Sequence, residues 1–155
     1  MTLTIADLVA EAAELDLPQF DEDTAWRLGL LLAGLAKGLP VVIDIRTADR
    51  TLFHASLPGS APLNDLWARR KSNTALRFHK ASLLVGLRHR EKAETLARHG
   101  LDPADYADHG GAVPIRVQGT GVVAVATVSG LPEVEDHQLV VRGIRALIAG
   151  QTFGE

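Results

Sequence analysis

A polar turn that leads into a helix is the segment of the sequence where chemistry is most strongly indicated. Residues 129–132 read Ser-Gly-Leu-Pro after a run of valine and alanine, and Asp136 and His137 follow in the next helix. Free backbone amides at a helix start attract anions. By helical spacing, His137 lies on the apolar face of that helix. Ser129, Gly130, Asp136 and His137 therefore predict a small-ligand pocket, although they do not identify a reaction.

The inward-facing His137 has two interpretations. Its imidazole is either satisfied by backbone groups near the turn or faces a ligand or metal. Ser129, Asp136 and His137 are also the residue types of a hydrolytic triad. Adjacent side chains on a helix point apart, so Asp136 cannot orient His137 as a triad requires. A triad is not expected.

The segment 62–80 is predicted to be a helix with cations on its apolar side. At 100° per residue its apolar arc contains five residues: Leu63, Leu66, Trp67, Thr74 and Phe78. Arg70 and Arg77 fall inside this arc, while Asn73 and Lys71 lie at its two edges. Burying an unpaired charge is costly. The arginines therefore pair with buried carboxylates such as Asp44, lie in a subunit interface, or line a pocket for an anionic ligand.

The remaining histidines are less specific. His109 precedes Gly110 and Gly111, which permit close approach of a ligand, but it is equally well explained as a polar loop residue. His79, His89 and His99 recur every ten residues, which does not place them on one face of a straight helix. No zinc-binding spacing occurs in the sequence, so no dedicated metal site is expected.

Composition excludes several classes of protein. The chain has 155 residues, a net charge of −3 and no cysteine, which excludes disulfides and thiolate chemistry and gives no indication of a nucleic-acid surface. No apolar stretch is long enough to span a membrane, and the acidic N-terminus does not resemble a signal peptide. We expect a single domain over residues 1–155 of a soluble, cytoplasmic protein.

The periodicity predicts an α+β fold. Two N-terminal helices, one after Thr4 and one after Asp21 or Asp23, precede a hairpin of strands 41–45 and 51–57. Helical segments 62–80 and 91–99, a second hairpin of strands 113–117 and 122–129, and a long helix 134–149 follow. Because no βαβ alternation occurs, the sheet should be mainly antiparallel, with helices packed on it.

Three strings resemble conserved segments of the haem-degrading domain family, in particular its branch of bacterial and fungal proteins. They are residues 67–78, the segment 109–115 that reads His-Gly-Gly-Ala-Val-Pro-Ile, and Val-Ser-Gly-Leu-Pro at 128–132 with Asp136 and His137. The resemblance implies a profilin-like fold, a homo-oligomer, and haem or another tetrapyrrole as a possible ligand. It also implies one site formed by Lys71, Asn73, His109, Gly111, Ser129, Gly130, Asp136 and His137.

Three functions are compatible with these observations. The first is an oligomeric small-ligand module, with Arg70, Lys71 or Arg77 binding the propionates of a tetrapyrrole and His109 or His137 approaching its metal. The second is a homo-oligomeric structural or interaction module without a cofactor, in which the helix arginines lie in an interface. The third is a haem-degrading enzyme, which would need bound haem, oxygen and a reductant.

Overall fold

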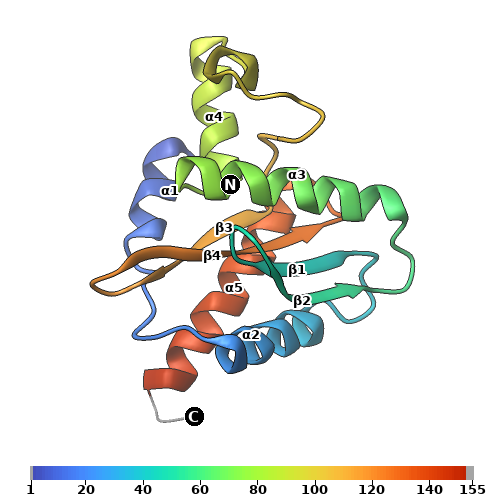
Figure 1. Cartoon of the computed structure of the whole chain (residues 1–155), viewed down its shortest axis with the longest axis vertical. Helices are drawn as coiled ribbons and strands as arrows, with labels where there is room; N and C mark the ends of the chain where they lie inside the picture. The colour runs from blue at the N-terminus through green and yellow to red at the C-terminus, as the bar shows by residue number, and fades with distance from the viewer. Residues whose placement is uncertain (1, 153–155) are drawn as a thin grey trace.

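The structure is a computed structural model that describes residues 2–152, and it has helices on both faces of one sheet (Figure 1). The helices are α1 (Ile5–Ala12), α2 (Glu22–Leu35), α3 (Pro62–Phe78), α4 (Ser82–Lys92) and α5 (Glu133–Thr152), with a 3₁₀ turn at Leu96–His99. The strands are β1 (Val42–Arg46), β2 (Thr51–Ser56), β3 (Ala112–Val117) and β4 (Gly121–Ser129). The predicted α+β class is confirmed.

The four strands form a fully antiparallel sheet in the order β2-β1-β4-β3. Each hairpin supplies two neighbouring strands, and the pairing of β1 with β4 joins the hairpins in the centre. Both faces of β1 are covered, so Val42–Ile45 are all buried. Because successive side chains alternate between faces, Ile43 and Ile45 point to one layer of helices and Asp44 to the other.

The apolar core lies between the sheet and the helices α2 and α5 (Figure 1). Leu28 and Leu32 of α2 pack there with Ile43 of β1 and Ile144 of α5, and all four are at most 1% exposed. The starts of α1 and α2 follow the expected capping rules. Asp21 accepts a hydrogen bond from the Thr24 amide, and Thr4 and Asp7 form a capping box at α1.

Helix α3 covers the opposite face of the sheet, and its predicted orientation is wrong. Leu63 and Leu66, expected to face inward, are 61% and 56% exposed. The face on the sheet instead carries small or polar residues, among them Ala68, Ser72 and Ala75. The sheet is polar here, and Ser72 Oγ lies 2.7 Å from Thr127 Oγ1 of β4. Small side chains let α3 approach the sheet closely. The apolar periodicity of the sequence gives no sign of this contact, because the residues that make it are small or polar.

The prediction of a helix at 91–99 is also wrong. Helix α4 ends at Lys92, where the sequence pattern had suggested a start, and Ala93 takes a left-handed conformation with φ 54°. Gly86 lies in the middle of α4, where glycine argues against a helix in a sequence pattern. Its missing side chain admits the Asp108 carbonyl oxygen, with which any Cβ would collide. Tertiary packing therefore explains this glycine.

Candidate functional site

The turn between β4 and α5 forms one wall of a small cavity, which we call the corner site. Its volume is about 220 Å³. The other walls come from α3 and from the loop before β3. Nine residues line it: Asn64, Trp67, Lys71, His109, Ser129, Gly130, Leu131, Glu133 and Asp136. The structure thus brings together five of the predicted site residues, namely Lys71, His109, Ser129, Gly130 and Asp136.

A buried ion pair occupies the base of the corner site. Lys71 Nζ lies 3.0 Å from Asp136 Oδ2, and the two side chains are 5% and 1% exposed. Burial is the largest influence on both groups: it lowers the pKa of Lys71 and raises the pKa of Asp136, and their mutual attraction opposes both shifts. The sequence analysis placed Lys71 at the edge of the apolar arc, and the structure corrects this to a buried position.

The anion-binding backbone amides predicted at this turn bind the carboxylate of Asp136. The backbone amides of Gly130 and Leu131 donate to its carboxylate at 3.2 and 2.9 Å. The chain's own carboxylate therefore fills the anion position, as an aspartate capping a turn does. Gly111 lies directly behind the pair with φ 138°, and a Cβ there would collide with the Val128 carbonyl oxygen and crowd Lys71. Gly111 is thus required for close packing.

His109 lies at the mouth of the corner site with its side chain 49% exposed. Its ring contacts Trp67 edge-to-face with centroids 5.1 Å apart, and its Nδ1 lies 3.8 Å from Asp108 Oδ1. Trp67 also stacks with Arg70, whose guanidinium carbon is 4.5 Å from the ring centroid. An exposed imidazole, an indole and a guanidinium therefore lie together at one surface.

Arg70, Asn73 and Arg77 hold the 103–106 segment against α3. Arg70 donates to the Pro103 carbonyl at 2.9 Å, and Asn73 donates to the Asp105 carbonyl at 2.8 Å. Arg77 donates to the Tyr106 hydroxyl at 2.7 Å. The pairing of these arginines with Asp44, one of three alternatives, is wrong, because backbone carbonyls accept from Arg70 and a tyrosine hydroxyl accepts from Arg77.

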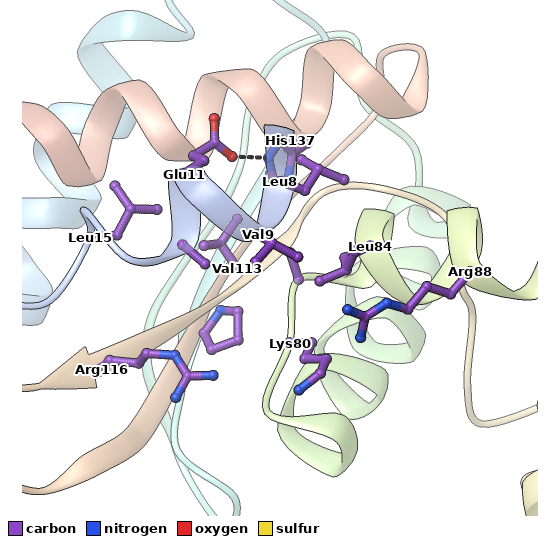
Figure 2. Close-up of a pocket in the computed structure, with 13 residues that line it drawn as sticks. Leu8, Val9, Glu11, Leu15, Lys80, Leu84, Arg88, Val113, Arg116 and His137 are labelled. Carbon is purple, nitrogen blue, oxygen red and sulfur yellow. Dashed lines mark hydrogen bonds and ion pairs between the residues drawn. The ribbon is translucent and has the colours of Figure 1, made fainter. Parts of the chain in front are cut away.

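His137 faces a different cavity from the corner site, so the predicted single site is divided. Its Nε2 lies 2.6 Å from Glu11 Oε1 of α1, while its Nδ1 has no partner among the described residues. The ring is 1% exposed and lines a second cavity, which Figure 2 shows between α1, α4 and β3. The expectation of a backbone partner near the turn is corrected to a carboxylate partner. The other expected role, facing a ligand, is not tested by this contact.

A cluster on the β1–β2 hairpin was missed. His54 Nδ1 lies 2.7 Å from Asp44 Oδ2, and its Nε2 lies 2.7 Å from Asp65 Oδ1 of α3. Burial, the largest single influence, lowers the pKa of His54, but the hydrogen bonds with both carboxylates outweigh it and raise this pKa overall. Arg46 completes the neutralisation of Asp44, which is fully buried. The alternation of the hairpin, which puts residues 44 and 54 on one face, was the available signal.

Two of the histidines spaced by ten meet after all. His89 Nε2 lies 3.1 Å from His99 Nε2, because the two belong to α4 and to the 3₁₀ turn, which fold against each other. Asp108 holds the other nitrogen of His89 at 2.8 Å. Across residues 2–152, no three histidine or acidic side chains gather closely enough to hold a metal ion.

Comparison with known sequences places the chain in a defined group. The family model described as "Haem degrading protein HbpS-like" matches residues 20–145. The UPF0303 protein SCO2848 of Streptomyces coelicolor is 49% identical over 148 residues, which is 94% of each chain. A UPF0303 protein of Paraburkholderia phymatum is 47% identical over 145 residues, which is 92% of this chain and 88% of the relative.

Solved structures show the same fold. The Ybr137w protein has a TM-score of 0.85 and 31% identity, covering 94% of this chain and 88% of that one. The PduOC:heme complex has a TM-score of 0.69 and 18% identity, covering 82% of this chain and 94% of that one. No helix within residues 2–152 is long and apolar enough to cross a membrane.

Proposed function

This chain belongs to the HbpS-like family of haem-degrading proteins, and we propose that it is an oligomeric module that binds haem or another tetrapyrrole on the exposed face of α3 beside His109. The observation that carries the proposal is the half-exposed imidazole of His109 against the indole of Trp67. A structural neighbour of similar fold was solved as a complex with haem, which adds support.

The exposed face of α3 has the chemistry that a tetrapyrrole needs. Leu63, Leu66, Trp67 and Arg70 follow one another at the spacing of a single helix face. The two leucines offer apolar area that is otherwise open to water, and Arg70 uses only part of its donor capacity on backbone carbonyls. A macrocycle would lie on the leucines and Trp67, with a propionate at Arg70.

Cavity size limits how such a ligand can bind. The corner site, at about 220 Å³, is smaller than the roughly 300–1,000 Å³ of typical cofactor pockets. The residues therefore fit a tetrapyrrole that lies across the surface of α3 and is covered by a second protomer, rather than one enclosed by a single chain. His109 would be the iron ligand, because its imidazole is half-exposed at the mouth of the corner site. Bound haem would supply the iron and its redox chemistry.

Haem titration of purified protein, followed at the Soret band, tests this proposal. We expect saturable binding that His109→Ala weakens by at least about tenfold. Substituting even a residue that only supports a metal ligand typically lowers metal affinity by that much. His79→Asn is the matched control, because His79 is exposed and its left-handed φ of 55° suits asparagine. Equal binding by wild type and His109→Ala would contradict the assignment of His109.

The alternative is a homo-oligomeric interaction module without a cofactor, and a specific observation favours it. Trp26 and Leu30 on α2 are 55% and 60% exposed, in addition to the two leucines of α3. The two helices lie on opposite faces of the sheet, so each exposes its own pair of apolar side chains, which is typical of protein interfaces. A protein that forms a defined oligomer yet shows no saturable haem band would support this alternative over tetrapyrrole binding.

A further inference from the structure

The cavity that His137 lines combines an apolar interior with cations, and we call it the α1–α4 groove. Its volume is about 170 Å³. Leu8, Leu15, Leu84 and Val113 form its apolar walls, and each is at most 6% exposed. Pro114 of β3 adds to the apolar lining. The groove therefore offers an apolar, shaped surface to a small apolar group.

Three cations from three different segments line the same groove. Lys80 lies between α3 and α4, Arg88 lies on α4, and Arg116 lies on β3. Figure 2 shows their head groups on the same side of the cavity, away from the pair formed by Glu11 and His137. Three cations that line one cavity make its electrostatic potential positive, which favours an anionic ligand there.

The chain itself does not supply that anion. Within residues 2–152, neither Lys80 nor Arg88 has a carboxylate or other hydrogen-bond partner, and Arg116 donates to the backbone carbonyl of His79. Glu11 is the one acidic side chain in the lining, and its carboxylate is engaged by His137 at 2.6 Å. The groove thus keeps an excess of positive charge.

His137 adds a second observation that the chain's own residues leave unexplained. It is 1% exposed and lines the groove, but its Nδ1 has no hydrogen-bond partner in the described part of the chain. Buried polar atoms in native proteins are nearly always paired, so an unpaired one calls for an explanation. Because the cations would hold the ligand's carboxylate on the opposite side of the groove, a water enclosed beside the ligand would provide that partner.

We propose that the α1–α4 groove binds a small amphipathic carboxylate. The apolar body would lie on Leu8, Leu84 and Val113, and the carboxylate would be held by Lys80, Arg88 and Arg116 in charge-assisted hydrogen bonds. A volume of about 170 Å³ suits a body the size of benzene, which fills an apolar cavity of roughly 150 Å³. A tetrapyrrole is far too large, so this site is separate from the proposed haem face.

Calorimetric titration with benzoate and hexanoate tests the proposal and separates an aromatic from an aliphatic body. Benzyl alcohol and hexanol serve as neutral analogues of the same size. We expect at least one carboxylate to bind saturably and its alcohol to bind at least about tenfold more weakly, because a hydrogen bond between charged groups contributes that much. Affinity should also fall with added salt.

Variants make the test specific to this groove. Arg88→Gln should weaken carboxylate binding by about tenfold or more, and Lys80→Gln should weaken it further. Arg50→Gln is the control, since Arg50 is exposed on the β1–β2 turn and lines no part of the groove. Absence of saturable binding for both carboxylates, equal binding of the alcohols, or unchanged binding in Arg88→Gln would each overturn the proposal. His109→Ala should leave carboxylate affinity unchanged, so failure here is distinguishable from failure of haem binding.

Discussion

Lys71 and Asp136 are 65 positions apart in the sequence, yet their charged groups meet at 3.0 Å beneath the β4–α5 turn. Lys71 comes from the middle of α3, on one face of the sheet, and Asp136 from the first turn of α5. The amides of Gly130 and Leu131 complete the coordination of the carboxylate. This pair ties α3, β4 and α5 together at the corner site.

Neutralising one member of this pair should destabilise the protein strongly. Lys71→Met leaves a buried carboxylate without its counter-charge, and Asp136→Asn leaves a buried ammonium. We expect each variant to lower the free energy of unfolding by about 3–5 kcal/mol, the range measured when one partner of a buried pair is removed. Chemical denaturation checks this.

The double variant Lys71→Met/Asp136→Asn provides the control for the previous prediction. With neither charge present, the loss should be clearly smaller than the sum of the two single losses, because no unpaired charge remains buried. Additive losses would mean that the two charges do not interact in the folded protein.

Gly111→Ala should destabilise the fold although it adds only one methyl group. The position has φ 138°, and the new Cβ would collide with the Val128 carbonyl oxygen and press on Lys71. We expect a loss of roughly 1–3 kcal/mol, as for other overpacked sites. Gly34→Ala is the matched control, since nothing lies within 4 Å of a Cβ there. At this exposed helical position alanine should raise the free energy of unfolding by about 1 kcal/mol. Thermal unfolding of both variants distinguishes collision from a general effect of alanine.

His54 should make stability depend on pH. Its pKa is raised in the folded protein by its two carboxylate partners, so the folded state binds the proton more tightly than the unfolded chain. This stabilisation is fully present below the ordinary histidine pKa of about 6.5 and is lost as pH rises through the raised value. The free energy of unfolding should therefore decrease as pH rises above about 6.5.

The variant His54→Gln isolates that contribution. Glutamine cannot titrate, so the decrease in stability over the same pH range should be smaller than in the wild type. His79→Asn, which removes an exposed histidine, should retain the wild-type slope. An unchanged slope in His54→Gln would exclude His54 as its source.

Self-association should depend on the exposed leucines. Leu30→Glu on α2 and Leu66→Glu on α3 put a charge where 60% and 56% of the side chain is now exposed. If these faces are covered in a homo-oligomer, the charge would be buried unpaired, and sedimentation velocity should show a shift toward folded monomer. Arg50→Gln should sediment as the wild type does. Unchanged sedimentation of both leucine variants would exclude these faces as the interface.

Local patterns were sufficient for most elements. The alternation of the two hairpins and the capping residues of the N-terminal helices correspond to real strands and helices, because these signals act over a few residues. The same reasoning failed at α4. There Gly86 is needed by a loop more than twenty residues later, and no local signal records such a contact.

The candidate site likewise has some features set by local sequence and others set by tertiary packing. The sequence by itself determined the family, the α+β class and part of the corner, because Ser129, Gly130 and Asp136 stand at a turn and a helix start recognisable from residue type alone. Only the tertiary structure decided that Asp136 and His137 serve different cavities. Neighbours on a helix diverge by 100°, and what each one meets, Lys71 or Glu11, depends on how distant segments pack. The cations of the α1–α4 groove converge for the same reason, since no local pattern links Lys80, Arg88 and Arg116.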